Sequence, residues 1–188
     1  MSWRVKGVLF ADYVKMIRSH KGVDWSRHLT PEDVDYLSAT IAPADWYPMA
    51  TFERLGNAIL REIARGDLEA VRMWGRYSVD QLRAAAPTLI ADRDPVETLM
   101  RFRVLRSTFF DFEALQLPTL VEGHAQVVIG YGMGHQAEEA ASFQTMGFFE
   151  RLLEMAGGAD IVAGFSERCW ADDDRTLLAL DWRMTPIG

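Results

Sequence analysis

The sequence is poor in cysteine and in long apolar runs, and each shortage excludes a class of protein. Cys169 is the only cysteine in 188 residues, so no internal disulfide can form and a zinc site made of several cysteines is impossible. No apolar run approaches the roughly 18 residues that a bilayer-spanning helix needs. Asp12 and Lys15 interrupt the N-terminal stretch where a secretion signal would require an apolar core. We therefore expect a cytoplasmic protein without a membrane span.

Positive charge is scarce in the second half of the chain. The net charge at pH 7 is −7, which divides into +2 for residues 1–106 and −9 for residues 107–188. A general nucleic-acid-binding protein needs a basic surface to neutralise phosphates, so we expect no nucleic-acid partner. Hydrophobic residues make up 49% of the chain and charged residues 25%, which is ordinary for a folded globular protein and excludes a disordered one.

The first half of the chain has the pattern of consecutive helices. Apolar residues recur at helical spacing, and glycine or proline follows where that spacing stops. Two segments combine an N-cap, a proline at the first helical position and acids in the first turn. They are Thr30-Pro31-Glu32-Asp33 and Asp94-Pro95-Val96-Glu97. We expect five helices: one over 7–20, one from 30, one over 46–65, one over 67–86 and one from 94.

The second half changes to the period of strands. Branched and aromatic residues predict strands over 108–117, 124–131, 161–170 and 175–184, with a broad apolar helix over 136–156. A short turn joins the last two strands, so they should form an antiparallel hairpin. We expect a single domain over 1–188 of class α+β. Its helical N-terminal half, 1–106, packs on a C-terminal β-β-α-β-β unit, 107–188, whose four-stranded antiparallel sheet leaves one face for solvent or a partner.

A glycine-rich segment, residues 130–134 (GYGMG), lies between an expected strand and an expected helix. Phosphate-binding loops use such glycines, because they let the backbone approach a pyrophosphate at a helix N-terminus. The sixth position of the dinucleotide-binding pattern is His135, however, and the elements that follow predict a hairpin instead of a parallel βαβ unit. Glu138 and Glu139 would repel phosphate. A flexible connection is the favoured interpretation of this segment.

Metal chemistry has weak support in the sequence. His135 and Glu138 are three residues apart on an expected helix, and His124 is close in sequence. Two or three scattered ligands do not make a metal site. We expect no metal ion and no cofactor.

Enzymatic chemistry has weak support as well. No GxSxG motif occurs, and Cys169 falls in an expected strand. The remaining polar candidates are Arg76, Asp111 and Glu113. We expect Arg76 to be an exposed helix residue that pairs with Asp80, four positions on, and the two acids to lie on the wet face of a strand. We therefore expect a protein that is not an enzyme.

The aromatic content, with six tryptophans and ten phenylalanines, leaves three interpretations open. The first is a close-packed core. The second is an apolar pocket for a small ligand between the helical and sheet halves, and the third is an exposed surface for a protein partner. The pocket would be lined by Leu9, Trp74, Phe102, Leu105 and Met146. The partner surface would include Trp25, Trp46 and Tyr47.

Two short segments near the N-terminus, residues 6–10 (KGVLF) and 13–15 (YVK), and the order of the expected elements resemble one superfamily. It holds the heme–nitric-oxide/oxygen-binding (H-NOX) domains and their heme-free relatives, the 4-vinyl-reductase domains and the TRAPP vesicle-tethering subunits. Within this group, residues 44–48 (ADWYP) and 75–77 (GRY) are most similar to a myxobacterial paralogous family of uncharacterised proteins. The likeness covers nearly the whole chain.

The chain departs from the heme-binding members where the heme would be held. Those members carry an iron-ligating histidine on the helix before the first strand, and Arg106 falls near that position here. They also hold the heme propionates with a Tyr-x-Ser-x-Arg motif. The corresponding residues 131–135 have the tyrosine without the serine or the arginine. The resemblance therefore implies an H-NOX-like protein without heme.

These inferences lead to one expected function and one alternative. We expect a non-enzymatic binding or scaffold module in signalling, which acts through protein contacts and self-associates, with a dimer as the expected assembly because relatives of this group commonly pair. The alternative is a sensor for a small apolar ligand, with its pocket between the two halves.

Overall fold

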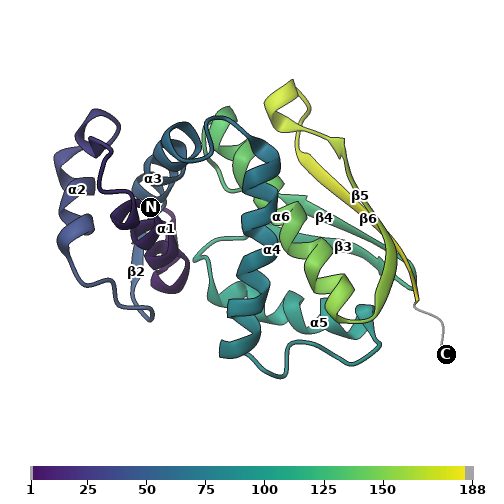
Figure 1. Ribbon diagram of the computed structural model, residues 1–188. Helices are drawn as coiled ribbons and strands as arrows, with labels where there is room; N and C mark the ends of the chain where they lie inside the picture. The colour runs from purple at the N-terminus through teal and green to yellow at the C-terminus, as the bar shows by residue number, and fades with distance from the viewer. Residues whose placement is uncertain (1, 185–188) are drawn as a thin grey trace. The chain divides into compact units, whose positions relative to one another are not determined.

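A computed structural model describes residues 2–184, and it divides them into two compact units. The first comprises residues 2–68 and 107–113, and the second comprises residues 69–106 and 114–184. The expected helical half, 1–106, is therefore shared between the two units. The expected fold class is confirmed: five helices precede a β-β-α-β-β segment whose four strands form an antiparallel sheet (Figure 1).

The first unit is mainly helical. Its elements are β1 (Arg4–Lys6), α1 (Gly7–Ser19), the 3-10 turn η1 (Trp25–Arg27), α2 (Pro31–Ser38), β2 (Trp46–Pro48) and α3 (Met49–Glu62). The helix expected over 46–65 begins three residues later than predicted, because Trp46–Pro48 pairs with β1 as a short antiparallel strand.

The core of the first unit lies between α1 and α3. The apolar residues of α1 recur at helical spacing, so Phe10, Val14 and Ile17 share one buried face. The Phe10 ring stacks on Tyr47, with centroids 4.5 Å apart, and Leu55 of α3 is fully buried. Aromatic packing thus supplies much of the core of this unit, as the first interpretation of the aromatic surplus predicted.

The start of α2 follows the sequence signal. The Thr30 hydroxyl accepts the backbone N–H of Asp33, and the Asp33 carboxylate accepts the N–H of Thr30, which makes a complete capping box. The same carboxylate is fully buried and accepts two hydrogen bonds, of 2.7 and 2.8 Å, from the Arg54 guanidinium of α3. One acidic residue therefore caps α2 and ties it to α3.

Residues 107–113 return to the first unit, which corrects the strand expected over 108–117. Lys6 donates its N–H to the carbonyl of Phe109 at 2.8 Å, and Val5 forms an isolated antiparallel bridge with Phe110. Phe109 and Phe110 are both buried, so their packing holds this stretch against β1. Asp111 is exposed, as expected, and its side chain pairs with Arg4 at 2.7 Å.

The second unit holds the sheet and the longest helices. Its elements are α4 (Leu68–Ala85), α5 (Pro95–Leu105), β3 (Leu115–Val121), β4 (His124–Ile129), α6 (His135–Met155), β5 (Gly158–Glu167), the 3-10 turn η3 (Cys169–Ala171) and β6 (Thr176–Met184), and the 3-10 turn η2 (Arg106–Thr108) spans the boundary with the first unit. The capping signal of α5 is confirmed, since the Asp94 side chain accepts the N–H of Glu97 at 2.8 Å. Cys169 lies in η3 instead of the expected strand.

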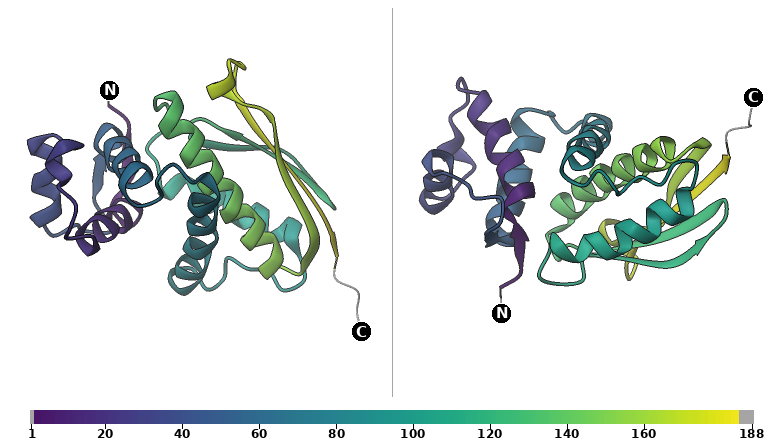
Figure 2. Two further views of the ribbon diagram at one scale, coloured as in Figure 1. Left: turned by 45° about the horizontal axis from the view of Figure 1, so that its top comes forward. Right: turned by 90° about the horizontal axis from the view of Figure 1, so that it is seen from below.

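The sheet has the strand order β3-β4-β6-β5, and every neighbouring pair is antiparallel. The expected hairpin of the last two strands is confirmed. Alternation places Val127, Leu178 and Leu180 on one buried face, and α6 packs along β5 and β6 with Phe149 and Leu152 buried. Figure 2 shows α6 across one face of the sheet, while the other face carries polar pairs such as His124 with Asp181.

No helix among residues 2–184 combines the length and the apolar character that crossing a membrane requires.

The Asp33–Arg54 pair makes stability depend on pH in a defined window. Burial alone would raise the pKa of Asp33, but hydrogen bonds from Arg54 and from the Thr30 backbone outweigh it and lower the pKa from 3.8 to about 2. A depressed carboxyl pKa stabilises the fold above the unfolded-state value, and this contribution is lost as the pH falls from about 4 to about 2. We expect Asp33→Asn to lose about 2 kcal/mol of unfolding free energy at pH 7.

That difference from wild type should shrink toward zero at pH 2, where Asp33 of the wild type becomes protonated. Denaturant unfolding followed by circular dichroism at both pH values measures it. A difference that stays constant with pH would contradict this assignment.

Candidate functional site

The helices α4 and α6 of the second unit cross with their backbones in contact. A Cβ atom added to Gly75 would collide with the carbonyl oxygen of Gln144, and one added to Gly147 would collide with the carbonyl oxygen of Arg72. Only glycine fits at either position, because each helix fills the space where a side chain of the other would begin. No layer of side chains, and therefore no ligand, separates the two helices at this crossing.

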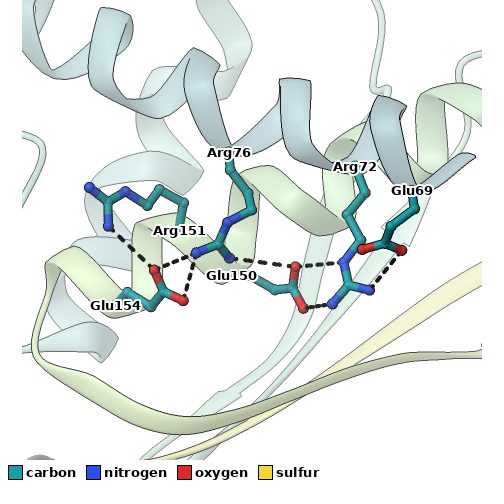
Figure 3. A network of polar contacts seen from close by, with 6 residues as sticks. All are labelled: Glu69, Arg72, Arg76, Glu150, Arg151 and Glu154. Carbon is teal, nitrogen blue, oxygen red and sulfur yellow. Dashed lines mark hydrogen bonds and ion pairs between the residues drawn. The ribbon is translucent and has the colours of Figure 1, made fainter. Parts of the chain in front are cut away.

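A ladder of ion pairs holds the same two helices together (Figure 3). Arg72 of α4 donates to both oxygens of the Glu150 carboxylate, with 2.8 Å from Nε to Oε2. Arg76, one turn further along α4, donates to Glu154 at 2.7 and 2.8 Å and lies 3.8 Å from Glu150. The Glu150 side chain is buried, with 7% of its surface exposed. These two guanidinium groups therefore stabilise its charge in place of water.

The ladder corrects the expectation for Arg76. Arg76 is half-buried and pairs across helices with Glu154, whereas Asp80 pairs with Arg151 of α6 at 3.5 Å. The hydrogen bond with Glu150 raises the pKa of Arg72 above its ordinary value, so the arginine stays charged at any physiological pH. These acids and bases neutralise one another, and the ladder supports a structural role for them.

The residues predicted to line a pocket do not all lie in one unit. Leu9 belongs to the first unit, and Trp74, Phe102, Leu105 and Met146 belong to the second. The ring of Phe102 on α5 packs against Phe148 and Phe149 of α6, with centroids 5.1 Å apart in both cases.

Burial differs among the four residues of the second unit. Phe102 and Met146 are buried at 3% and 5% exposure, while Trp74 and Leu105 are half-buried. Phe102 is thus part of a packed aromatic cluster, and pocket lining by the other residues stays a prediction.

The glycine-rich segment 130–134 is held by a carboxylate of the chain itself. Glu138, in the first turns of α6, accepts the backbone N–H of Tyr131 at 2.7 Å and that of Met133 at 3.0 Å. Its side chain is buried, with the residue 3% exposed, and the N-terminus of a helix favours a negative charge at this place. The amide donors of the loop therefore bind an internal anion.

Tyr131, the one matching residue of the propionate-binding motif, also has internal partners. Its hydroxyl lies 2.6 Å from the Thr145 hydroxyl, which in turn donates to the carbonyl of Ala141 at 2.8 Å. Tyr131 is therefore the donor of the first bond, and its buried side chain anchors the loop to the middle of α6.

The residues of the second unit do not fit a heme. α5 carries no histidine, cysteine or tyrosine, its one sulfur atom is the thioether of Met100, and Arg106 directly follows it. In the segment that corresponds to the propionate-binding motif, the serine and the arginine are absent and the Tyr131 hydroxyl is already bonded to Thr145. Three histidines are engaged elsewhere: His28 with Glu62 at 2.6 Å, His124 with Asp181 at 2.8 Å, and His20 with the carbonyl of Met16 at 2.9 Å.

No group of three or more histidine, cysteine, aspartate or glutamate side chains within residues 2–184 is arranged to hold a metal ion. His135 and Glu138, the expected pair, differ in setting, because His135 is exposed at the start of α6 and Glu138 is buried against the loop.

The three residues predicted to form a partner surface differ in exposure. Trp25 is buried at 9% exposure, and its indole N–H donates to the carbonyl of His20 at 3.2 Å, so it belongs to the core and not to an exposed surface. Trp46 and Tyr47 are half-buried. The ammonium group of Lys6 lies 4.3 Å from the centre of the Trp46 ring. Partner contact at Trp46 and Tyr47 stays a prediction.

Three features of this region escape a reading of the sequence. Nothing in the sequence indicates that the mid-helix glycines at 75 and 147 each contact the helix that carries the other. The sequence did contain a signal for the ladder of ion pairs. Arg72 and Arg76 are four residues apart in one helix, as are Glu150 and Glu154 in another, so each pair lies on one face of its helix. Glu138 was noticed as a charge that repels phosphate, but its bond to the loop depends on tertiary structure.

Solved structures with the same fold are H-NOX proteins. A variant of the H-NOX protein from S. oneidensis in the Fe(II) ligation state matches with a TM-score of 0.67 at 10% identity, over 96% of this chain and 97% of that one. A variant of the T. tengcongensis H-NOX matches with a TM-score of 0.62 at 15% identity, over 97% and 100%. A structure that probes heme distortion in the H-NOX family matches with a TM-score of 0.64 at 16% identity, over 97% of both chains.

No protein-family model and no curated protein sequence matches the chain. The chain thus has an H-NOX-like fold at low sequence identity.

The crossing of α4 and α6 predicts that Gly147→Ala destabilises the protein. The new methyl group would force the helices apart, so we expect a loss of about 3 kcal/mol of unfolding free energy. Gly130→Ala is the control, since a Cβ there meets nothing within 4 Å, and its effect should stay below about 1 kcal/mol. Urea unfolding compares the two variants, and equal effects would contradict the close approach of the helices.

The ladder predicts strong coupling between Arg72 and Glu150. In a double-mutant cycle of Arg72→Ala and Glu150→Ala, we expect a coupling energy of about 2 kcal/mol, because the glutamate is buried. The exposed pair Arg101 and Glu97, at 2.8 Å, is the control and should couple by less than about 0.5 kcal/mol. If the buried pair couples as weakly as the control pair, the ladder adds little to the unfolding free energy.

Proposed function

We propose that this protein is a heme-free, non-enzymatic binding or scaffold module that acts in signalling through protein contacts and self-association. The observation that carries the proposal is the Glu138 carboxylate, which accepts the Tyr131 and Met133 amides of the loop that corresponds to a propionate-binding motif. The H-NOX-like fold supports a sensory or signalling setting. The single cysteine favours a cytoplasmic one.

The absence of heme rests on two independent features of the second unit. The histidine ligand is missing, because no histidine occurs between His28 and His124 and α5 therefore presents no imidazole. The propionate clamp is incomplete, because residues 131–135 lack the serine and the arginine of the motif and the Tyr131 hydroxyl bonds Thr145. A substitution that restores the iron ligand alone, or the propionate site alone, would still leave the other one missing.

A non-enzymatic role is supported by the pairing of the charged side chains. Catalytic acids and bases need a strongly perturbed pKa and access to a substrate. In the second unit, Arg72, Arg76, Glu150 and Glu154 neutralise one another across two helices. Asp111, one of the few polar candidates from the sequence, pairs with Arg4, which lowers its pKa although its burial acts in the opposite direction. These groups stabilise the fold.

Protein contacts fit the exposed chemistry of the first unit. Trp46 and Tyr47 remain accessible in part on the short strand β2, and aromatic residues are enriched in interfaces. The likeness of residues 44–48 to a myxobacterial paralogous family belongs to this proposal too. Trp46→Ala is the first variant to compare with wild type in partner capture.

A second candidate is a sensor for a small apolar ligand. It is favoured by the half-buried Trp74 and Leu105, which lie in the same unit as the buried Met146, and by a fold shared with proteins studied for ligation at heme. A lipid or hydrocarbon that co-purifies with the protein in native mass spectrometry would support this function over the scaffold role.

A hemin titration tests the central part of the proposal. We expect the absorption spectrum to remain that of free hemin, because α5 carries no histidine and residues 131–135 lack the serine and the arginine of the propionate-binding motif. His20→Ala is the control for adventitious coordination at a surface imidazole. A stoichiometric Soret band that His124→Ala or His135→Ala abolishes, and that His20→Ala leaves unchanged, would contradict the proposal.

A further inference from the structure

The short strand β2 separates the two aromatic residues, Trp46 and Tyr47, that are predicted to contact a partner. The Tyr47 ring stacks on Phe10 in the core of the first unit, with centroids 4.5 Å apart. The Tyr47 hydroxyl accepts the backbone N–H of Ala42 at 2.9 Å. Successive side chains of a strand point to opposite faces, so Trp46 lies on the outer face of β2. Of the two residues, Trp46 is therefore the one that a partner can reach.

Two cations share this outer face with Trp46. Lys6 is directly opposite Trp46 in the register of β1 and β2, and its ammonium group lies 4.3 Å from the centre of the Trp46 ring. Arg4, two residues earlier on β1, has its guanidinium carbon 5.8 Å from the same ring centre. The electron-rich face of an indole attracts cations, so the ring holds both side chains in place.

The two cations differ in whether a carboxylate neutralises them. The Asp111 carboxylate accepts the Nε–H and the backbone N–H of Arg4, both at 2.7 Å. No carboxylate within residues 2–184, Asp45 beside Trp46 included, forms an ion pair with Lys6, which is half-buried. Lys6 is thus held over the ring without a counter-charge. A carboxylate from another molecule would supply one, and less of the entropy cost of ordering a free lysine would remain.

We propose that Lys6 and Trp46 form the docking site for an acidic segment of a partner protein. Lys6 binds a carboxylate of that segment, and the accessible part of Trp46 packs against a neighbouring apolar side chain. This inference rests on the partner contact in the proposed function, and it names the chemistry of the partner. Nucleic acids and anionic membranes present many phosphates and need several cations together. A single ammonium group without a counter-charge suits one carboxylate, so charge favours a protein segment as the occupant.

The experiment compares two lysines of the first unit. Lys6→Met removes the charge and keeps an unbranched chain over the ring. Lys21→Met is the matched control, because Lys21 is exposed and has neither a ring nor a carboxylate as a partner among residues 2–184. The two variants have the same net charge, so non-specific attraction of an anion changes equally in both.

The probe is a fluorescein-labelled synthetic peptide of glutamate, glycine and leucine residues. The same peptide with glutamine in place of glutamate is its uncharged control. Fluorescence anisotropy measures the dissociation constant of each peptide, and circular dichroism checks that every variant is folded.

We expect wild type to bind the acidic peptide. Lys6→Met should raise the dissociation constant about fivefold, and Lys21→Met should raise it less than about twofold. Lys6→Arg should keep most of the affinity, because it keeps the charge. Trp46→Ala should weaken binding as well, because the ring that positions the ammonium group is lost. Lys6→Met should leave the binding of the glutamine peptide unchanged.

Three results would overturn the docking site. Equal dissociation constants for Lys6→Met and Lys21→Met would reject Lys6 as the anchor. A wild type that does not bind the acidic peptide would reject an acidic partner at this face. An anionic vesicle or a single-stranded oligonucleotide that binds through Lys6 more tightly than the peptide would reject a protein segment as the occupant. The self-association in the proposed function is tested separately, by light scattering of the wild type alone, so it can survive each of these results.

Discussion

The bond from Glu138 to the amides of Tyr131 and Met133 is the interaction on which the functional account depends. A carboxylate buried at a helix N-terminus is stable only when donors surround it, and here the loop supplies them. The loop gains an ordered shape from this bond and loses its capacity to bind an external anion. The same fold occurs in H-NOX proteins such as the S. oneidensis protein in its Fe(II) ligation state.

The crossing of α4 and α6 gives this region its rigidity. Glycines at 75 and 147 bring the two backbones into contact, and guanidinium groups of α4 neutralise carboxylates of α6 on the flank of that contact. The ion pairs depend on the glycines, because the side chains reach across only when the helices are close. The crossing therefore fixes the position of α4 on α6 within the second unit.

Much of the fold followed from the sequence, because capping and periodicity are local. The signals at Thr30 and Asp94 placed two helix starts correctly, and alternation along residues 175–184 identified the last strand. The segment 107–113 was predicted wrongly, since its aromatic residues look like a strand but are buried against β1 through hydrogen bonds to residues a hundred positions away.

The candidate site was harder to predict, because its contacts join distant residues. Arg76 has Asp80 as a local partner four residues on, and only tertiary packing shows that Glu154 takes that place. Trp25 was predicted to be on a partner surface, yet its indole packs inward. The resemblance predicted that no imidazole is present at the position of Arg106, because that prediction needs only the sequence. It did not predict that the Glu138 carboxylate binds the loop.

Native mass spectrometry of the protein, produced in cells supplied with excess heme precursor, tests the central claim most directly. The account predicts the mass of the polypeptide alone or of whole-number assemblies of it. A mass increased by one heme for each chain, which persists after gel filtration, would contradict it.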